Sequence, residues 1–219
     1  PQGSGVGYYK LTKTGALTLV GTLPDGTAVT NTSTLSGANT WRLFAPLYGN
    51  KGLLAGNVSL ITGDAFTDIQ GYNSVWICPV LDRQHYPAGW PLGIIVDTVG
   101  AKLNVTPGTS IVPGLPVGGA ANLAFSAGAL NPSPQGRPLT ITSADIVPSG
   151  STDAGFTMKI DRKTGLYSGT FTHSDGTKVS YQGVIVNKNP VNPCIGFFLT
   201  SSPAVKTYTG QGGNVSLQR

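Results

Sequence analysis

Two stretches of this chain share a turn motif that restricts both of them to β-hairpins. "LTKTGALTLVGTLPDGTAVTN" (Leu11 to Asn31) and "IDRKTGLYSGTFTHSDGTKVS" (Ile160 to Ser180) lie about 150 residues apart, and each places Lys-Thr-Gly before Asp-Gly-Thr. In both copies the first glycine precedes the aspartate by ten residues. Asp-Gly between alternating strands is a strong short-range hairpin signal. The motif therefore predicts a turn, a strand and a second turn, twice in one chain.

Each residue type in the motif has a physical task in a turn. Glycine supplies the positive φ that a β-carbon disfavours, and aspartate accepts backbone N–H groups within the turn. The predicted structural turn residues are Gly15, Asp25, Gly26, Gly165, Asp175 and Gly176. We interpret the repetition as a duplicated half-domain. In the alternative, the two aspartates act as a carboxylate pair, which would require the two turns to meet in space.

The acidic residues favour strands and turns over helices in the rest of the chain. All nine are Asp, a turn and cap residue, and Glu, a good helix former, does not occur. The chain also contains 31 Gly and 16 Pro, and only 11% of it is charged, against about 25% in ordinary domains. We predict an all-β fold, mostly antiparallel, as a meander barrel or sandwich of about ten to twelve strands. Two duplicated halves are expected to share one core.

The domain organisation follows from the change of composition in the middle of the chain. "PAGWPLGIIVDTVGAKLNVTPGTSIVPGLPVGG" (Pro87 to Gly119) is rich in Gly and Pro and is expected to cross the surface, with short strands at "GIIVD" and "AKLNVT". We therefore predict a single β module, 1–219, whose halves span about 1–98 and 120–219.

Several apolar motifs resemble those of a known group of proteins. They are "WRLFAPLY" (41–48), "KGLLAG" (51–56), "SVW" (74–76), "TGLYSGTF" (164–171) and "GFFL" (196–199). With them the chain resembles, over nearly its whole length, the C-terminal all-β modules of large bacterial, Verrucomicrobia-like cell-surface proteins that carry immunoglobulin-like repeats. The resemblance implies an extracellular module, and it transfers no catalytic residue. A cysteine pair is a departure from the pattern.

The expected function is that of a non-enzymatic extracellular structural or adhesion module, including self-assembly, without a cofactor. Its partners would be other copies of itself or other surface proteins. The terminal segments 6–10 and 214–218 are β-prone and pair either within the chain or with a neighbour. Nucleic acid is not an expected partner, because the net charge of +5 is not gathered into a basic cluster. No apolar run reaches the roughly 18 residues of a membrane span.

The alternative function is that of a carbohydrate-binding module in the loop around "LDRQHYPAGW". Sugar sites combine aromatic platforms with polar hydrogen-bond partners, and the candidate binding residues here are Trp76, Asp82, Arg83, His85, Tyr86 and Trp90. Against this interpretation, Trp76 lies in a strand pattern and would equally serve as a core anchor.

Metal and redox chemistry have weaker signals. Asp64 and Asp68 in "GDAFTD" are a candidate calcium site that would need backbone carbonyls as further ligands. Cys78 and Cys194 are either buried thiols or a disulfide, which would close a loop of about 115 residues and contribute roughly 4 to 5 kcal/mol. No G-x-S-x-G motif frames a serine, and His173 is expected to be exposed in its hairpin.

Overall fold

The fold of the chain is all-β, as predicted. The computed structural model describes residues 1–128, 136–143, 146–148, 155–174, 176–188, 194–200 and 211–218. Within these ranges fifteen strands form antiparallel sheets, more than the ten to twelve expected from the sequence. The same ranges contain no helix, and so none that is long and apolar enough to cross a membrane.

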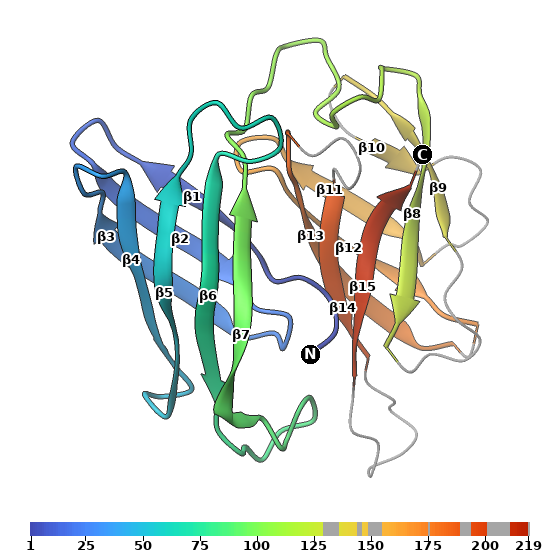
Figure 1. Cartoon of the computed structure of the whole chain (residues 1–219). Helices are drawn as coiled ribbons and strands as arrows, with labels where there is room; N and C mark the ends of the chain where they lie inside the picture. The colour runs from blue at the N-terminus through green and yellow to red at the C-terminus, as the bar shows by residue number, and fades with distance from the viewer. Residues whose placement is uncertain are drawn as a thin grey trace.

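The first seven strands form two sheets that pack face to face, on the left of Figure 1. Their order is β1-β2-β3 in one sheet and β4-β5-β6-β7 in the other. We call these seven strands the N-terminal unit. They are β1 (Val6–Leu11), β2 (Ala16–Thr22), β3 (Ala28–Thr34), β4 (Thr40–Leu47), β5 (Gly52–Leu60), β6 (Ile69–Cys78) and β7 (Trp90–Gly100).

Alternation of apolar and polar residues sets the inner and outer faces of this unit. In β4, Trp41 and Leu43 are buried, whereas Arg42 and Phe44, which alternate with them, are exposed. Successive side chains of a strand point to opposite faces, so "TWRLFAPL" supplies one wall of the core. Leu17 of β2 faces the same core from the other sheet.

The remaining eight strands form one curled sheet, on the right of Figure 1. Its order is β10-β9-β8-β15-β14-β13-β12-β11, and its end strands β10 and β11 approach each other. We call it the C-terminal unit. Its strands are β8 (Ala120–Ala127), β9 (Arg137–Ile141), β10 (Ile146–Pro148), β11 (Thr157–Asp161), β12 (Leu166–Thr172), β13 (Lys178–Ile185), β14 (Cys194–Leu199) and β15 (Gly212–Gln218).

The two units have separate hydrophobic cores, whereas the sequence predicts one shared core. An aromatic cluster around Phe125, Phe171 and Phe198 fills the C-terminal unit. The Gly/Pro-rich connection belongs partly to each unit. Its "GIIVD" lies in β7, "AKLNVT" forms no strand, and Ile111 and Val112 are buried in the second core. The connection is therefore anchored by apolar side chains instead of merely crossing the surface.

Both copies of the turn motif form the hairpins that the sequence predicts. Gly26 and Gly176 have φ of +86° and +85°, and their N–H groups each donate to the carbonyl three residues earlier at 2.9 Å. Gly15 and Gly165 also have positive φ, of +83° and +75°. Asp175 lies outside the described residues. His173 is not exposed but buried (5% exposed), because it continues the inward alternation of Phe171.

The duplication of a half-domain stays a prediction. The meander β1-β2-β3 has a counterpart in β11-β12-β13, but the next strand differs in its pairing. β14 is hydrogen-bonded to β13, whereas β4 lies in a different sheet from β3. Both terminal segments pair within the chain, β1 with β2 and β15 between β14 and β8. Both edges of β15 are thus occupied.

Candidate functional site

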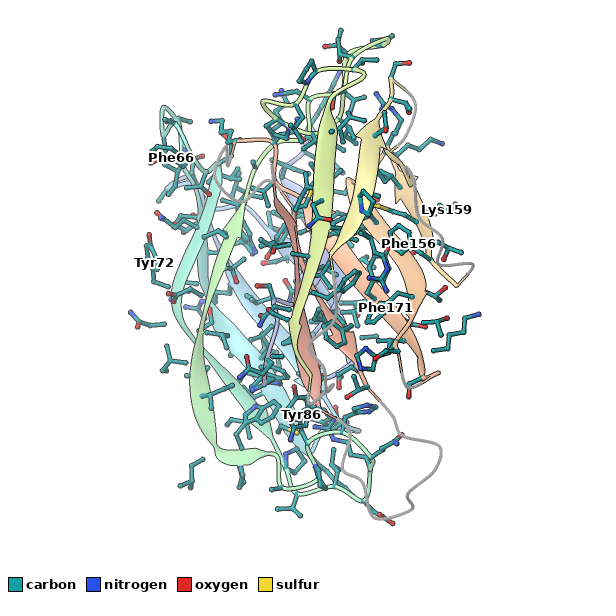
Figure 2. The ribbon with its side chains drawn as sticks, turned by 90° about the vertical axis from the view of Figure 1, so that its right-hand side faces the viewer. Phe66, Tyr72, Tyr86, Phe156, Lys159 and Phe171 are labelled. Atoms are coloured by element: carbon teal, nitrogen blue, oxygen red, sulfur yellow. The ribbon has the colours of Figure 1, made fainter. Side chains whose placement is uncertain are left out.

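The loop between β6 and β7, residues 79–89, brings the predicted binding residues to the junction of the two units. We call it the 79–89 loop. It carries Arg83, His85 and Tyr86, and Figure 2 shows Tyr86 at the lower end of the molecule. Each of these three side chains has a polar partner elsewhere in the chain, so the loop is tied down from several sides.

Arg83 forms a buried ion pair with Asp25 of the turn between β2 and β3, within the N-terminal unit. Arg83 Nη1 lies 2.9 Å from Asp25 Oδ2, and the two side chains are 20% and 0% exposed. Asp25 Oδ1 accepts the Thr27 backbone N–H at 2.9 Å, as expected of a turn aspartate. Tyr48 donates its hydroxyl to Asp25 Oδ2 at 2.6 Å and accepts the indole N–H of Trp76 at 3.0 Å. The carboxylate is therefore sealed inside the protein, where no external substrate can reach it.

Tyr48 is fixed in place by this network. Burial and the neighbouring Asp25 carboxylate raise the pKa of its phenol well above the ordinary value, so the hydroxyl stays protonated as a donor. Its backbone has a φ of +55°, a left-handed conformation that is unfavourable for a bulky side chain. The hydrogen bonds and the Arg83 guanidinium, 5.3 Å from the ring centroid, offset this cost.

Tyr86 and His85 connect the loop to the C-terminal unit. The Tyr86 hydroxyl accepts the backbone N–H groups of Gln2 at 3.1 Å and of Gly212 at 2.9 Å. His85 Nε2 lies 2.7 Å from the carbonyl oxygen of Thr200, and a carbonyl can only accept, so Nε2 carries a proton. Tyr86 also has a positive φ, +52°. The loop conformation is thus held by contacts between the units.

The aromatic residues proposed as a sugar platform pack mainly on one another. Trp76 is 1% exposed and is not available to a ligand. Trp90 makes an edge contact with Trp76 at 4.5 Å between ring centroids, and Tyr86 makes one with Trp90 at 5.8 Å. Asp82 is exposed, but Arg83 is committed to Asp25. The structure brings these residues together as a support for the loop and not as an open aromatic surface.

A lysine occupies the position of the cation expected between Asp64 and Asp68. Lys188 Nζ lies 2.6 Å from Asp68 Oδ1 and 2.9 Å from the Asp64 carbonyl oxygen. Burial raises the pKa of Asp68, but the hydrogen bonds from Lys188 and from the Lys102 backbone outweigh it, so the pKa lies below the ordinary value. Asp64 Oδ1 is used by the Phe66 and Thr67 backbone N–H groups. No group of three metal-ligating side chains occurs in the described ranges.

The cysteines are free and buried, so of the two alternatives from the sequence the disulfide is not formed. The reason is that each thiol is enclosed by its own unit. Cys78 ends β6, and its Sγ accepts the Arg83 Nη2 donor at 2.9 Å. Cys194 begins β14 within the core of the C-terminal unit, where burial raises the pKa of its thiol.

The segment before β1 also contacts the C-terminal unit. The Ser4 backbone N–H donates to the Gly196 carbonyl at 3.2 Å, and the neighbouring Phe197 is buried. Gly3 has a φ of +86°, and a Cβ there would lie 2.5 Å from the Phe197 Cβ. Only glycine lets the chain pass this close to β14.

Two residues with structural roles were not found by sequence reasoning. Tyr48 is the last residue of the apolar motif "WRLFAPLY", and its position next to Asp25 depends on how the two sheets of the N-terminal unit face each other. Lys188 belongs to none of the motifs found in the sequence. A basic residue in a turn predicts solvent exposure by itself, and no local signal pairs it with Asp68, 120 residues away.

No protein-family model, curated protein or solved structure matches this chain.

Proposed function

We propose that this chain is a non-enzymatic, extracellular structural or adhesion module of a bacterial surface protein. One observation carries the proposal: polar side chains hold the two β units together. His85, Tyr86 and Lys188 each bond between the two units, and Arg83 fixes the 79–89 loop to Asp25 within the N-terminal unit. A module in a surface protein must keep its shape while it is exposed to force and to solvent, and such cross-links serve that purpose.

The surface composition also supports an extracellular role. Charged residues are few, and Thr, Ser, Asn and Gly occupy many of the described exposed positions on strands and turns. The apolar motifs that resemble bacterial surface modules fall on β4, β5, β6, β12 and β14, which build the cores and sheets of both units. The resemblance therefore concerns the framework of the fold.

The carbohydrate-binding alternative has less support. It required Trp76, Tyr86 and Trp90 to form an exposed platform, and Trp76 is buried. The hydroxyl of Tyr86 is already used by two backbone N–H groups. A ligand in this loop would have to displace contacts that join the two units.

Antibody labelling of the source cells tests the proposed location. An antibody raised against the purified chain should label intact cells as strongly as permeabilised cells. A cytosolic protein probed in parallel should be labelled only after permeabilisation, which controls for leaky cells. Labelling of the chain that also requires permeabilisation would contradict the proposal.

A further inference from the structure

We propose that two copies of this chain associate through the outer face of the β4-β5-β6-β7 sheet. This inference deepens the proposed function and rests on it for the expectation that copies meet at a surface. The outer face points away from the core of the N-terminal unit, and Figure 2 shows Tyr72 of β6 projecting from it into solvent.

The outer face has a continuous apolar patch. The strand register aligns Phe44, Ala55, Val75 and Ile95 in one row across all four strands. Leu53 and Ile77 form a second apolar row beside it. Phe44 and Ile95, at the two ends of the first row, are 56% and 62% exposed. Large exposed apolar patches of this kind mark interaction sites.

Two charged residues border the apolar patch, and their positions favour a second copy of the chain as the partner of this face. Arg42 of β4 and Asp97 of β7 are both exposed, and they lie at opposite edges of the sheet on the same side of the patch. A two-fold axis parallel to the strands, between two sheets packed face to face, places β4 of one copy over β7 of the other. Each Arg42 then meets the other copy's Asp97, and Phe44 meets the other copy's Ile95. The face is thus complementary to itself in charge and in polarity.

The size of the face suits a weak dimer. Four strands about 4.8 Å apart and eight residues of about 3.4 Å give a footprint of roughly 500 Å² per copy. Two such footprints reach about 1,000 Å², the lower limit for a specific interface. Aligned packing of two sheets is an established arrangement for such faces. We therefore expect association that depends on concentration.

A charge exchange tests this dimer by sedimentation velocity of the full chain over a concentration series. Arg42→Asp and Asp97→Arg should each weaken dimerisation at least about tenfold, because each places like charges together. The double variant R42D/D97R should restore it to within about threefold, since the pairing is recreated with reversed polarity. Lys159→Asp is the matched control and should have no effect. It changes an exposed charge on β11, which Figure 2 shows on the other side of the molecule from Tyr72.

Two results would overturn the inference. One is a wild-type chain that stays monomeric at all concentrations. The other is a dimer that neither single variant weakens, which would indicate pairing through the edge strand β7 or another surface. Neither result bears on the antibody labelling that tests the extracellular location, so failure of the dimer and failure of the proposed function can be told apart.

Discussion

Substitution of Arg83 by Met should destabilise the protein much more than loss of the ion pair between Lys188 and Asp68, which joins the two units. Arg83→Met keeps a long side chain but leaves the Asp25 carboxylate, whose side chain is 0% exposed, without its ion-pair partner. Tyr48 and the Thr27 backbone remain as donors and compensate in part. Breaking a buried ion pair costs about 3 to 5 kcal/mol. Since Arg83 is itself 20% exposed, we expect a loss near the lower end, about 3 kcal/mol.

Lys188→Met is the matched comparison. Its ion pair with Asp68 has side chains that are 32% and 24% exposed, and pairs of this kind contribute about 1 kcal/mol or less. Urea unfolding followed by tryptophan fluorescence gives both free energies of unfolding. The double variant D25N/R83M should lose less free energy of unfolding than the single variants D25N and R83M lose together, because the double variant leaves no unpaired buried charge. Equal losses in Arg83→Met and Lys188→Met would refute this account of the two ion pairs.

Three further predictions concern buried groups. Burial raises the pKa of Tyr9 to about 12 and the pKa values of Tyr48, Tyr167 and Tyr181 further. In a spectrophotometric titration of the native protein these phenols should therefore ionise well above pH 10, whereas in denaturant they should ionise near pH 10. The stability that comes from keeping them neutral is lost as the pH rises through their pKa values in the folded protein. Both cysteines should resist alkylation in the native protein and react fully in denaturant without reductant, and a mass showing unlabelled, disulfide-linked chain would contradict this. Gly183→Ala should cost about 3 kcal/mol or more in a thermal melt, because its Cβ would lie 1.8 Å from the Tyr167 ring, whereas Gly37→Ala, with open space around it, should change little.

Much of the local structure is predictable from short stretches of sequence. Asp25-Gly26 and its counterpart before Gly176 specify their hairpins because the required positive φ and the side-chain acceptor are properties of those residues alone. The alternation in "TWRLFAPL" likewise specifies which face of β4 is buried. The all-β class follows from many such local preferences acting together.

The candidate binding loop shows where local reasoning ends. Trp76, Tyr86 and Trp90 lie near one another, since they are close in the chain and border adjacent strands. Their exposure was not predictable, because it depends on what the opposite sheet and the C-terminal unit place over them. Of the two alternatives for the cysteines, the structure has buried thiols, and the choice also depended on tertiary structure: Cys194 lies in the core of the C-terminal unit, whereas Cys78 is buried beside Arg83 in the N-terminal unit.

The sequence by itself determined the hairpins, the strand faces and the all-β class, because these depend on residues a few positions apart. Only the tertiary structure decided that Arg83 pairs with Asp25, 58 residues away, and Lys188 with Asp68, 120 residues away. Such pairs depend on the order of strands within the sheets and on how the two units pack, which no local period encodes. Because of the same long-range geometry, the 79–89 loop, which the sequence presented as a candidate ligand-binding loop, instead joins the two units through His85 and Tyr86.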